Sequence, residues 1–269
     1  MAKKKQLIIP IFIPQYGCPH QCVFCNQSNI TGRREKPDMS EVADTINLYL
    51  STWKGSGRKE VAFYGGSFTG LERCVQETFL KTAYKFVAAG SINFIRVSTR
   101  PDYITDEILT LLKRYKVETV ELGVQSMDDE VLRLSGRGHT AIDTIAAVAL
   151  LKRYNFKVGL QFMPGLPGDT EETILSTADK IIGLRPDFVR IYPTVVVRDT
   201  PLADMHQKGL YNPWPLSDMV KTCKRLVCLF NAQRIPIIRL GLHAAESLEK
   251  AIVAGPYHQS FRDLIHRTA

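Results

Sequence analysis

Residues 94–124, FIRVSTRPDYITDEILTLLKRYKVETVELGV, contain two apolar runs joined by a segment of different periodicity. The runs from Phe94 to Thr99 and from Glu118 to Val124 are rich in β-branched and aromatic residues and predict strands. Between them, Thr105 precedes DEILTLLKRY, where its hydroxyl can cap a helix whose apolar residues recur with helical spacing. The stretch therefore predicts a strand, a helix and a second strand in succession.

The same unit recurs along the rest of the chain. Ser40, Thr140 and Asp169 are the predicted caps of further helices. Further strands are predicted at Leu7 to Ile13, Val61 to Tyr64, Lys157 to Met163, Asp187 to Tyr192 and Pro236 to Leu240. Apolar strands that alternate with amphipathic helices predict an α/β fold with a parallel sheet covered by helices. Periodicity alone does not distinguish an open doubly wound sheet from a complete or partial barrel, so both remain open.

Either architecture places a binding site at the carboxyl ends of the strands. The unusual residues of this chain follow the predicted strands directly. They are the cysteine-containing loop after the first strand, GGSFTG at 65–70, Arg100 to Asp102, Gln125 with Ser126, and MPGLPGDT at 163–170. We expect these segments to lie together at the end of the sheet where the strands have their carboxyl ends.

The cysteine-containing loop is GCPHQCVFC at residues 17–25, which spaces Cys18, Cys22 and Cys25 as CxxxCxxC. A structural zinc ion needs four protein ligands, so that zinc would require a further ligand such as His20. Three thiolates equally suit a 4Fe-4S cluster whose remaining iron is open to a small molecule. Three unrelated buried cysteines are the remaining alternative. The other cysteines lie in helix-like apolar patterns and are expected to pack as small hydrophobes: Cys74, Cys223 and Cys228.

Composition limits the class of protein. The chain has 269 residues, of which 45% are hydrophobic and 23% charged, as is ordinary for a globular protein, so one large domain is the default. No apolar run reaches the length of a membrane span, and the N-terminus lacks the features of a secretory signal, so we expect no membrane association and a cytoplasmic location. The net charge of +8 permits an anionic partner.

The cysteine spacing, with Phe24 directly before the last cysteine, resembles the signature of the radical S-adenosylmethionine (SAM) enzymes. That resemblance implies a partial TIM-type (β/α)6 barrel with an additional C-terminal strand and helix extension, in which the three cysteines hold a 4Fe-4S cluster. It also implies that an electron from the cluster cleaves SAM to a 5'-deoxyadenosyl radical. The electron would come from a donor such as flavodoxin or ferredoxin.

The same resemblance assigns the SAM-binding residues. GGSF at 65–68 is similar to the glycine motif of this superfamily, so that Gly65, Gly66 and Ser67 would meet the methionyl end of SAM. Phe24 would lie near the adenine, Ser98 and Gln125 near the ribose or methionyl groups, and Arg137 near the carboxylate. Gln161 is a weaker candidate. Possible substrate contacts on or after the sixth strand are Arg190, Tyr192, Arg198 and His206.

Four segments resemble more specifically the catalytic subunit of elongator and its bacterial relatives, whose partner is tRNA. They are STRPDYIT at 98–105, ELGVQSMDDEVL at 121–132, RGHT at 137–140 and VVVRDTPLADMHQKGLYNPW at 195–214. LGVQS with Arg137, and the later GLPGDT, are also similar to oxygen-independent coproporphyrinogen III oxidases. The leading hypothesis is a radical SAM enzyme of tRNA modification. The alternatives are a porphyrinogen-type oxidative decarboxylase and a zinc-bearing basic RNA-binding module.

The chain departs from the elongator subunit in two respects. That subunit has a longer spacing before its second cluster cysteine, and its acetyltransferase domain has no counterpart here. We expect a radical SAM core barrel at residues 1–200 and a truncated C-terminal extension at residues 201–269.

Overall fold

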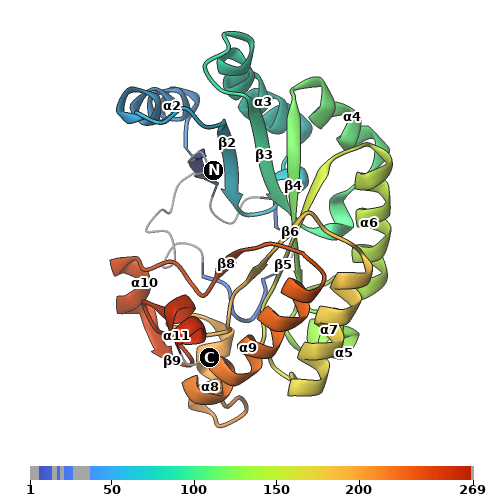
Figure 1. Cartoon of the computed structure of the whole chain (residues 1–269), viewed down its shortest axis with the longest axis vertical. Coiled ribbons are helices and arrows are strands. Elements are labelled where there is room, and N and C mark those ends of the chain that lie inside the picture. Colours follow the sequence, from blue (N-terminus) through green and yellow to red (C-terminus); the bar gives the residue numbers. More distant parts are fainter. Residues whose placement is uncertain (1–5, 14–16, 19–20, 27–36, 268–269) are drawn as a thin grey trace.

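The computed structural model describes residues 6–13, 17–18, 21–26 and 37–267. Seven strands form one sheet in the order β1-β2-β3-β4-β5-β6-β8, and every neighbouring pair is parallel. The sheet curls into a half-barrel, and the helices α2, α3, α4, α6, α7 and α9 follow one another along an arc outside it (Figure 1). The expected partial barrel is therefore confirmed.

The strands of this sheet are β1 (Leu7–Ile13), β2 (Lys59–Gly65), β3 (Phe94–Thr99), β4 (Val117–Gln125), β5 (Lys157–Phe162), β6 (Phe188–Ile191) and β8 (Ile237–Leu240). The helices are α2 (Met39–Thr52), α3 (Arg73–Ala88), α4 (Asp106–Arg114), α5 (Asp129–Leu134), α6 (Ala141–Arg153), α7 (Glu171–Gly183), α8 (Pro201–Gln207), α9 (Leu216–Ala232), α10 (Glu246–Ala251) and α11 (Phe261–Arg267). Two short 3-10 helices, η1 (Phe68–Gly70) and η2 (Pro101–Tyr103), follow β2 and β3. The strands β7 (Val196–Val197) and β9 (Ile252–Ala254) pair in a separate antiparallel ribbon.

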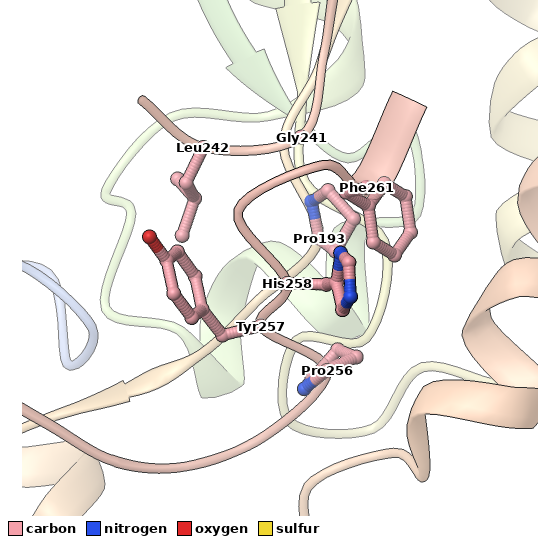
Figure 2. Close-up of a pocket in the computed structure, with 7 residues that line it drawn as sticks. All are labelled: Pro193, Gly241, Leu242, Pro256, Tyr257, His258 and Phe261. Atoms are coloured by element: carbon pink, nitrogen blue, oxygen red, sulfur yellow. The ribbon is translucent and has the colours of Figure 1, made fainter. Parts of the chain in front are cut away.

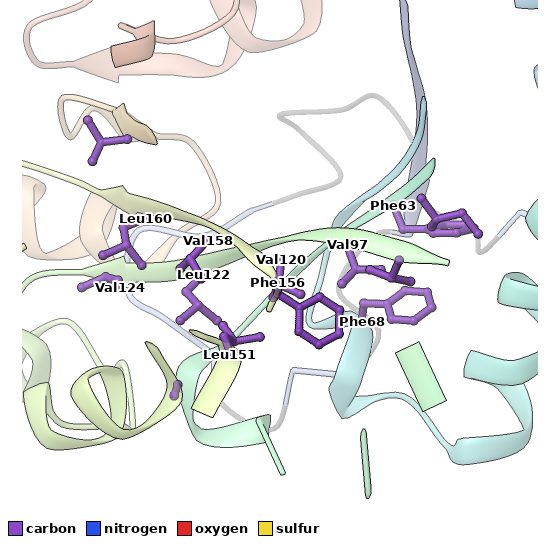
Figure 3. Close-up of a cluster of buried hydrophobic side chains, with 14 of the residues drawn as sticks. Phe63, Phe68, Val97, Val120, Leu122, Val124, Leu151, Phe156, Val158 and Leu160 are labelled. Carbon is purple, nitrogen blue, oxygen red and sulfur yellow. The ribbon is translucent and has the colours of Figure 1, made fainter. Parts of the chain in front are cut away.

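The main core lies between the sheet and the outer helices. Alternate residues of the central strands, among them Val97, Leu122 and Leu160, point toward the helices and are fully buried (Figure 3). Because side chains of a strand alternate between its two faces, the other residues of these strands face the inside of the half-barrel. The continuously apolar strands expected from the sequence are correct for the outer face only, because the inner face carries charged and polar side chains.

Two of the expected helix caps are wrong by one or two residues. Helix α2 is capped by Asp38 instead of Ser40, since an Asp38 carboxylate oxygen accepts the Glu41 N–H at 2.8 Å. Helix α7 is capped by Thr170, because the Asp169 carboxylate accepts the backbone N–H groups of Gly165 and Leu166 in the preceding turn. The caps at Thr105 and Thr140 are confirmed.

The expectation for the three isolated cysteines is confirmed for one of them. Cys223 is buried in the core between α9 and its neighbours. Cys74 and Cys228 are exposed, so the prediction that they pack as small hydrophobes is wrong. They lie on helices whose buried faces are formed by other residues, such as Phe79 on α3 and Leu226 on α9.

Candidate active site

The loop that carries the three cysteines is seated directly on the turn after β2. Gly17 has φ +74°, and a Cβ at this position would lie 2.1 Å from the Ser67 carbonyl oxygen. A Cβ at Gly70 would lie equally close, at 2.1 Å, to the carbonyl oxygen of Gly17. Only glycine at both positions permits so close an approach of two backbones. The cysteine loop and GGSFTG therefore form one unit, as the expected convergence of the two segments requires.

Two backbone hydrogen bonds hold the second half of the cysteine loop. The Val23 N–H donates to the Ser135 carbonyl at the end of α5, at 3.0 Å, and the Leu202 N–H in α8 donates to the Val23 carbonyl at 2.8 Å. The loop thus lies between segments that follow β2, β4 and β7. The segments after β2 and β4 lie at the carboxyl ends of strands of the parallel sheet, where the sequence predicted the site, and the segment after β7 adjoins them from the separate ribbon.

The three cysteines of this loop differ in their burial. Cys22 is buried, whereas Cys18 and Cys25 are half-buried. Burial raises the pKa of the Cys18 thiol, and the nearby positive charges of Arg137 and Arg100 oppose that rise. Among the described residues, no three His, Cys, Asp or Glu side chains gather into a metal-binding group. The ligand set of Cys18, Cys22 and Cys25 therefore stays a prediction, and His20 lies outside the described residues.

The GGSF turn contacts the first and third strands. Gly65 has φ +110°, and a Cβ there would lie 2.6 Å from the Ile13 carbonyl oxygen, to which the Gly66 N–H donates at 2.8 Å. The Ser67 hydroxyl lies 2.8 Å from that of Thr99 and accepts the Arg100 N–H at 3.3 Å. The glycines thus serve a close contact with β1, and the serine joins the turns after β2 and β3. Their contact with SAM stays a prediction.

The polar candidates of the central strands lie on the inner face or at its rim. Ser98 is opposite Glu121 in the sheet register, and Gln161 is flanked by Gly123 on β4 and Arg190 on β6. Gln125 ends β4 with φ +66° and is buried. Its side-chain carbonyl has no hydrogen-bond partner among the described residues. A buried acceptor of this kind is available to a ligand.

Phe24 lies in an apolar environment, unlike the polar candidates. Its ring is partly buried against an apolar cluster of Val196, Leu202 and Tyr211. The cluster joins the cysteine loop to α8 and to the β7–β9 ribbon. Its expected place beside an adenine is untested.

Arg137 is the candidate with the most informative contacts. One of its terminal nitrogens donates to the Cys22 sulfur at 3.5 Å, and the other donates to the Gly123 carbonyl at 2.5 Å. The side chain thus bridges the cysteine loop and β4. Sequence reasoning named Arg137 as a SAM ligand, but it gave no sign that this arginine contacts a cluster cysteine.

Two further buried side chains lie close to Arg137. Arg100 is bound through two nitrogens to the Asp102 carboxylate, at 3.0 Å each. His139 has no hydrogen-bond partner on either ring nitrogen among the described residues. Burial, together with the charges of Arg137 and Arg100, lowers the pKa of His139 to about 3. Sequence reasoning left His139 without a role, and the position of RGHT after the fourth strand was the only available signal.

A buried ion network lines the inner face, and sequence reasoning missed it. Arg96 on β3 makes a two-pronged contact with Glu60 on β2 and a further bond to Glu121 on β4. Arg190 on β6 also donates twice to Glu121, at 2.6 and 3.1 Å. It reaches the hydroxyl of Tyr64 at 3.1 Å as well. Four strands are therefore joined across the inside of the half-barrel by two arginines and two glutamates.

The candidate substrate contacts bind other parts of the chain. Arg190 belongs to the ion network, and one of its nitrogens also lies 3.4 Å from the Tyr192 hydroxyl. Arg198 donates to the Lys250 carbonyl at 3.3 Å, and the His206 ring lies 3.1 Å from the Tyr211 carbonyl. The structure thus gives these residues roles within the fold, and substrate contact stays a prediction for each.

The C-terminal segment packs beside the end of the half-barrel. Pro193, Gly241, Leu242, Pro256, Tyr257, His258 and Phe261 line a narrow crevice there (Figure 2). None of the predicted cofactor residues belongs to it. In the described part of the chain, no helix is long and apolar enough to cross a bilayer.

Comparison with known proteins gives two family matches. Residues 12–181 match the profile of the radical SAM superfamily, and residues 186–269 match the radical SAM C-terminal domain. The first match covers more than half of the chain.

Individual relatives agree with these matches. A tRNA uridine(34) acetyltransferase of Dehalococcoides mccartyi is 27% identical over 247 residues, which cover 78% of this chain and 54% of the relative. The chain therefore spans about half the length of that protein. The archaeal Elp3 of Methanocaldococcus infernus superimposes with a TM-score of 0.77 at 21% identity, over 98% of this chain and 62% of the other. The coproporphyrinogen III oxidase HemN of Escherichia coli gives a TM-score of 0.59 at 17% identity, over 86% and 53%. At these identities the two structures show the fold alone.

Proposed function

The chain belongs to the radical SAM superfamily, and on that premise we propose that Cys18, Cys22 and Cys25 hold a 4Fe-4S cluster to which SAM binds. Proteins of this superfamily bind such a cluster and SAM. The observation that carries the proposal is a loop of three closely spaced cysteines seated on the turn after β2, at the carboxyl end of that strand. Thiolates are the usual ligands of iron–sulfur clusters, and three of them leave one iron for SAM.

The surroundings of the loop also fit this pair of cofactors. Gln125 and Arg137 each keep a buried side-chain atom without a partner in the described part of the chain. Buried polar groups are usually satisfied, so that unused atoms beside the loop support a polar ligand there. When bound, the cluster supplies an electron and SAM supplies the 5'-deoxyadenosyl radical.

We assign roles to the chain's own residues within this proposal. Arg137 binds the SAM carboxylate, while Gln125 and Ser98 contact the ribose or methionyl groups. The GGSF turn at 65–68 contacts the methionyl end, Phe24 lies against the adenine, and Gln161 contributes from β5. These residues come from the cysteine loop, from strands β3 to β5 and from the turns that follow β2 and β4.

The substrate we propose is tRNA. The relative from D. mccartyi is named for its action on a tRNA uridine, and the chain's net charge of +8 suits a polyanionic partner. The porphyrinogen alternative has less support, because the likeness to HemN is one of fold only. The zinc alternative has less support because the family match implies an iron–sulfur cluster.

Three further parts of the proposal follow. The chain acts in the cytoplasm, and a low-potential donor such as flavodoxin or ferredoxin supplies its electron. Residues 1–200 form the core and residues 201–269 the extension. The family matches support such a division, since one ends at residue 181 and the other begins at residue 186.

The experiment measures 5'-deoxyadenosine released from SAM by the reconstituted, dithionite-reduced chain, with and without tRNA. We expect tRNA to raise the rate. We also expect binding of labelled tRNA to weaken steeply with salt, with a slope of about −0.7 to −0.9 in log affinity per neutralised phosphate. If SAM is cleaved but tRNA neither binds nor stimulates cleavage, the small-molecule alternative replaces the tRNA proposal.

A further inference from the structure

Three buried basic side chains lie near the cysteine loop. They are Arg100, Arg137 and His139, with exposed fractions of 2%, 6% and 5%. Arg100 follows β3, and the other two lie between α5 and α6. We call these three residues the basic layer. The layer faces the loop, because Arg137 contacts the Cys22 sulfur and both arginines act electrostatically on Cys18.

The basic layer has more donors than acceptors. One terminal nitrogen of Arg100, the Nε atom of Arg137 and both ring nitrogens of His139 have no partner among the described residues. Asp102 pairs with Arg100, whereas the hydrogen bonds of Arg137 to described residues go to a thiol and a backbone carbonyl. A buried donor left without an acceptor costs about 1–3 kcal/mol, and more when it is charged. The layer therefore has one buried positive charge in excess, directed toward the cysteine loop.

The buried arginines of the ion network provide a contrast. Arg96 and Arg190 have the carboxylates of Glu60 and Glu121 beside them, and all their side-chain nitrogens have partners. Burial of an arginine in this fold is thus compatible with full pairing. The basic layer, in contrast, has buried donors without acceptors among the described residues, and this points to an anion at the cysteine loop.

A cluster held by three thiolates is such an anion. The thiolate charges outweigh the positive charge of the oxidised core, and a one-electron reduction adds one more negative charge. A buried cation nearby stabilises the reduced form more than the oxidised form, because the interaction grows with the charge. A hydrogen bond to a cluster sulfur acts in the same direction.

We infer that Arg137, together with Arg100, raises the reduction potential of the cluster and that Arg137 holds the cysteine loop through Cys22. This role rests on the proposed function and adds to the contact of Arg137 with SAM. The electron comes from a low-potential one-electron donor, no bond is formed or broken, and the excess positive charge of the layer partly offsets the negative charge of the reduced cluster. Arg137 and Arg100 are positioning residues for the electron transfer.

The test is a redox titration of the reconstituted full chain, followed by the electron paramagnetic resonance signal of the reduced cluster, without SAM. In Arg137→Gln we expect the ratio of reduced to oxidised cluster at a fixed potential to fall about tenfold, which corresponds to 59 mV for one electron. Arg137→Lys keeps the charge but cannot contact both the Cys22 sulfur and the Gly123 carbonyl, so that its midpoint should fall between those of wild type and Arg137→Gln. Since SAM is absent, an arginine that acted only on SAM would leave the midpoint unchanged.

Arg133→Gln is the matched control. Arg133 lies on α5, close in sequence to Arg137, but its side chain is 68% exposed and paired with Glu130. Its replacement should leave the midpoint unchanged. If Arg137→Gln cannot hold iron, Arg100→Gln decides, with a smaller fall expected because Asp102 partly neutralises Arg100.

The outcomes separate the two proposals. A wild-type chain without an iron–sulfur cluster overturns the proposed function and this inference together. A wild-type cluster whose midpoint is the same in Arg137→Gln, or in Arg100→Gln when the first variant holds no iron, overturns the inference alone.

Discussion

Glu121→Gln should destabilise the fold far more than an equivalent change on the same strand. The Glu121 carboxylate is 4% exposed and accepts hydrogen bonds from Arg96 and Arg190, which are 7% and 14% exposed. A neutral amide there leaves Arg96 with Glu60 as its remaining carboxylate and removes the carboxylate that pairs with Arg190. It also places N–H donors against guanidinium donors.

The burial of this ion pair sets the expected loss of unfolding free energy. Removal of one partner from a buried ion pair costs about 3–5 kcal/mol of unfolding free energy. The matched control is Glu118→Gln, also on β4. Glu118 likewise pairs with two cations, Arg58 and Lys157, but it is 23% exposed and its partners are 48% and 47% exposed. Exposed pairs contribute about 0.2–1 kcal/mol each, so that the control should lose about 1 kcal/mol.

The assay is urea unfolding of the cluster-free chain, followed by far-ultraviolet circular dichroism. With a dependence of about 3 kcal/mol per molar urea, the midpoint of Glu121→Gln should fall by about 1–1.7 M, against about 0.3 M for Glu118→Gln. Equal shifts in the two variants would refute the reasoning, because burial of the network would then contribute nothing to its strength.

Three other predictions concern the cysteine loop and the basic layer. Replacement by Ala of any of the loop cysteines Cys18, Cys22 and Cys25 should abolish the binding of iron, measured per chain after reconstitution. The same replacement of an isolated cysteine should leave the iron content unchanged, and these are Cys74, Cys223 and Cys228. Gly17→Ala should also lower the iron content, since its Cβ would meet the Ser67 carbonyl oxygen at 2.1 Å; Gly90→Ala, which has φ +69° but no atom within 4 Å of a Cβ, is the control for backbone strain alone. His139, whose pKa is about 3 in the folded chain and about 6.5 when unfolded, binds a proton only on unfolding as the pH falls below 6.5. Wild type should therefore lose about 2 kcal/mol more unfolding free energy than His139→Leu between pH 7 and pH 5, measured by urea unfolding of cluster-free protein, and equal losses would contradict a buried neutral imidazole.

The sequence predicted the parallel sheet covered by helices well because the helix-facing residues of the strands, such as Val97 and Leu160, form regular apolar runs. The family resemblance then chose a partial barrel where periodicity could not. The ion network was missed because Arg96 and Glu121 are single charges within apolar strands. Their pairing depends on sheet register, which a single sequence does not specify.

Side-chain environments within the site were also hard to predict. The cysteine spacing and the position of Arg137 after the fourth strand indicated the right region of the fold. The contact of Arg137 with Cys22 joins residues 115 positions apart in the chain, and no local pattern encodes such a distance. Cys74 and Cys228 were misplaced for a related reason, since a small shift in helix phase moves a side chain from the core to the surface.

In the proposed function, three thiolates of one loop hold a cluster with an iron open to SAM. The most direct measurement is the electron paramagnetic resonance spectrum of the anaerobically reconstituted, reduced chain before and after addition of SAM, with iron and zinc determined on the same sample. We expect about four irons per chain and a signal that changes when SAM binds. A colourless chain with stoichiometric zinc, or a cluster signal that SAM leaves unchanged, would contradict the claim.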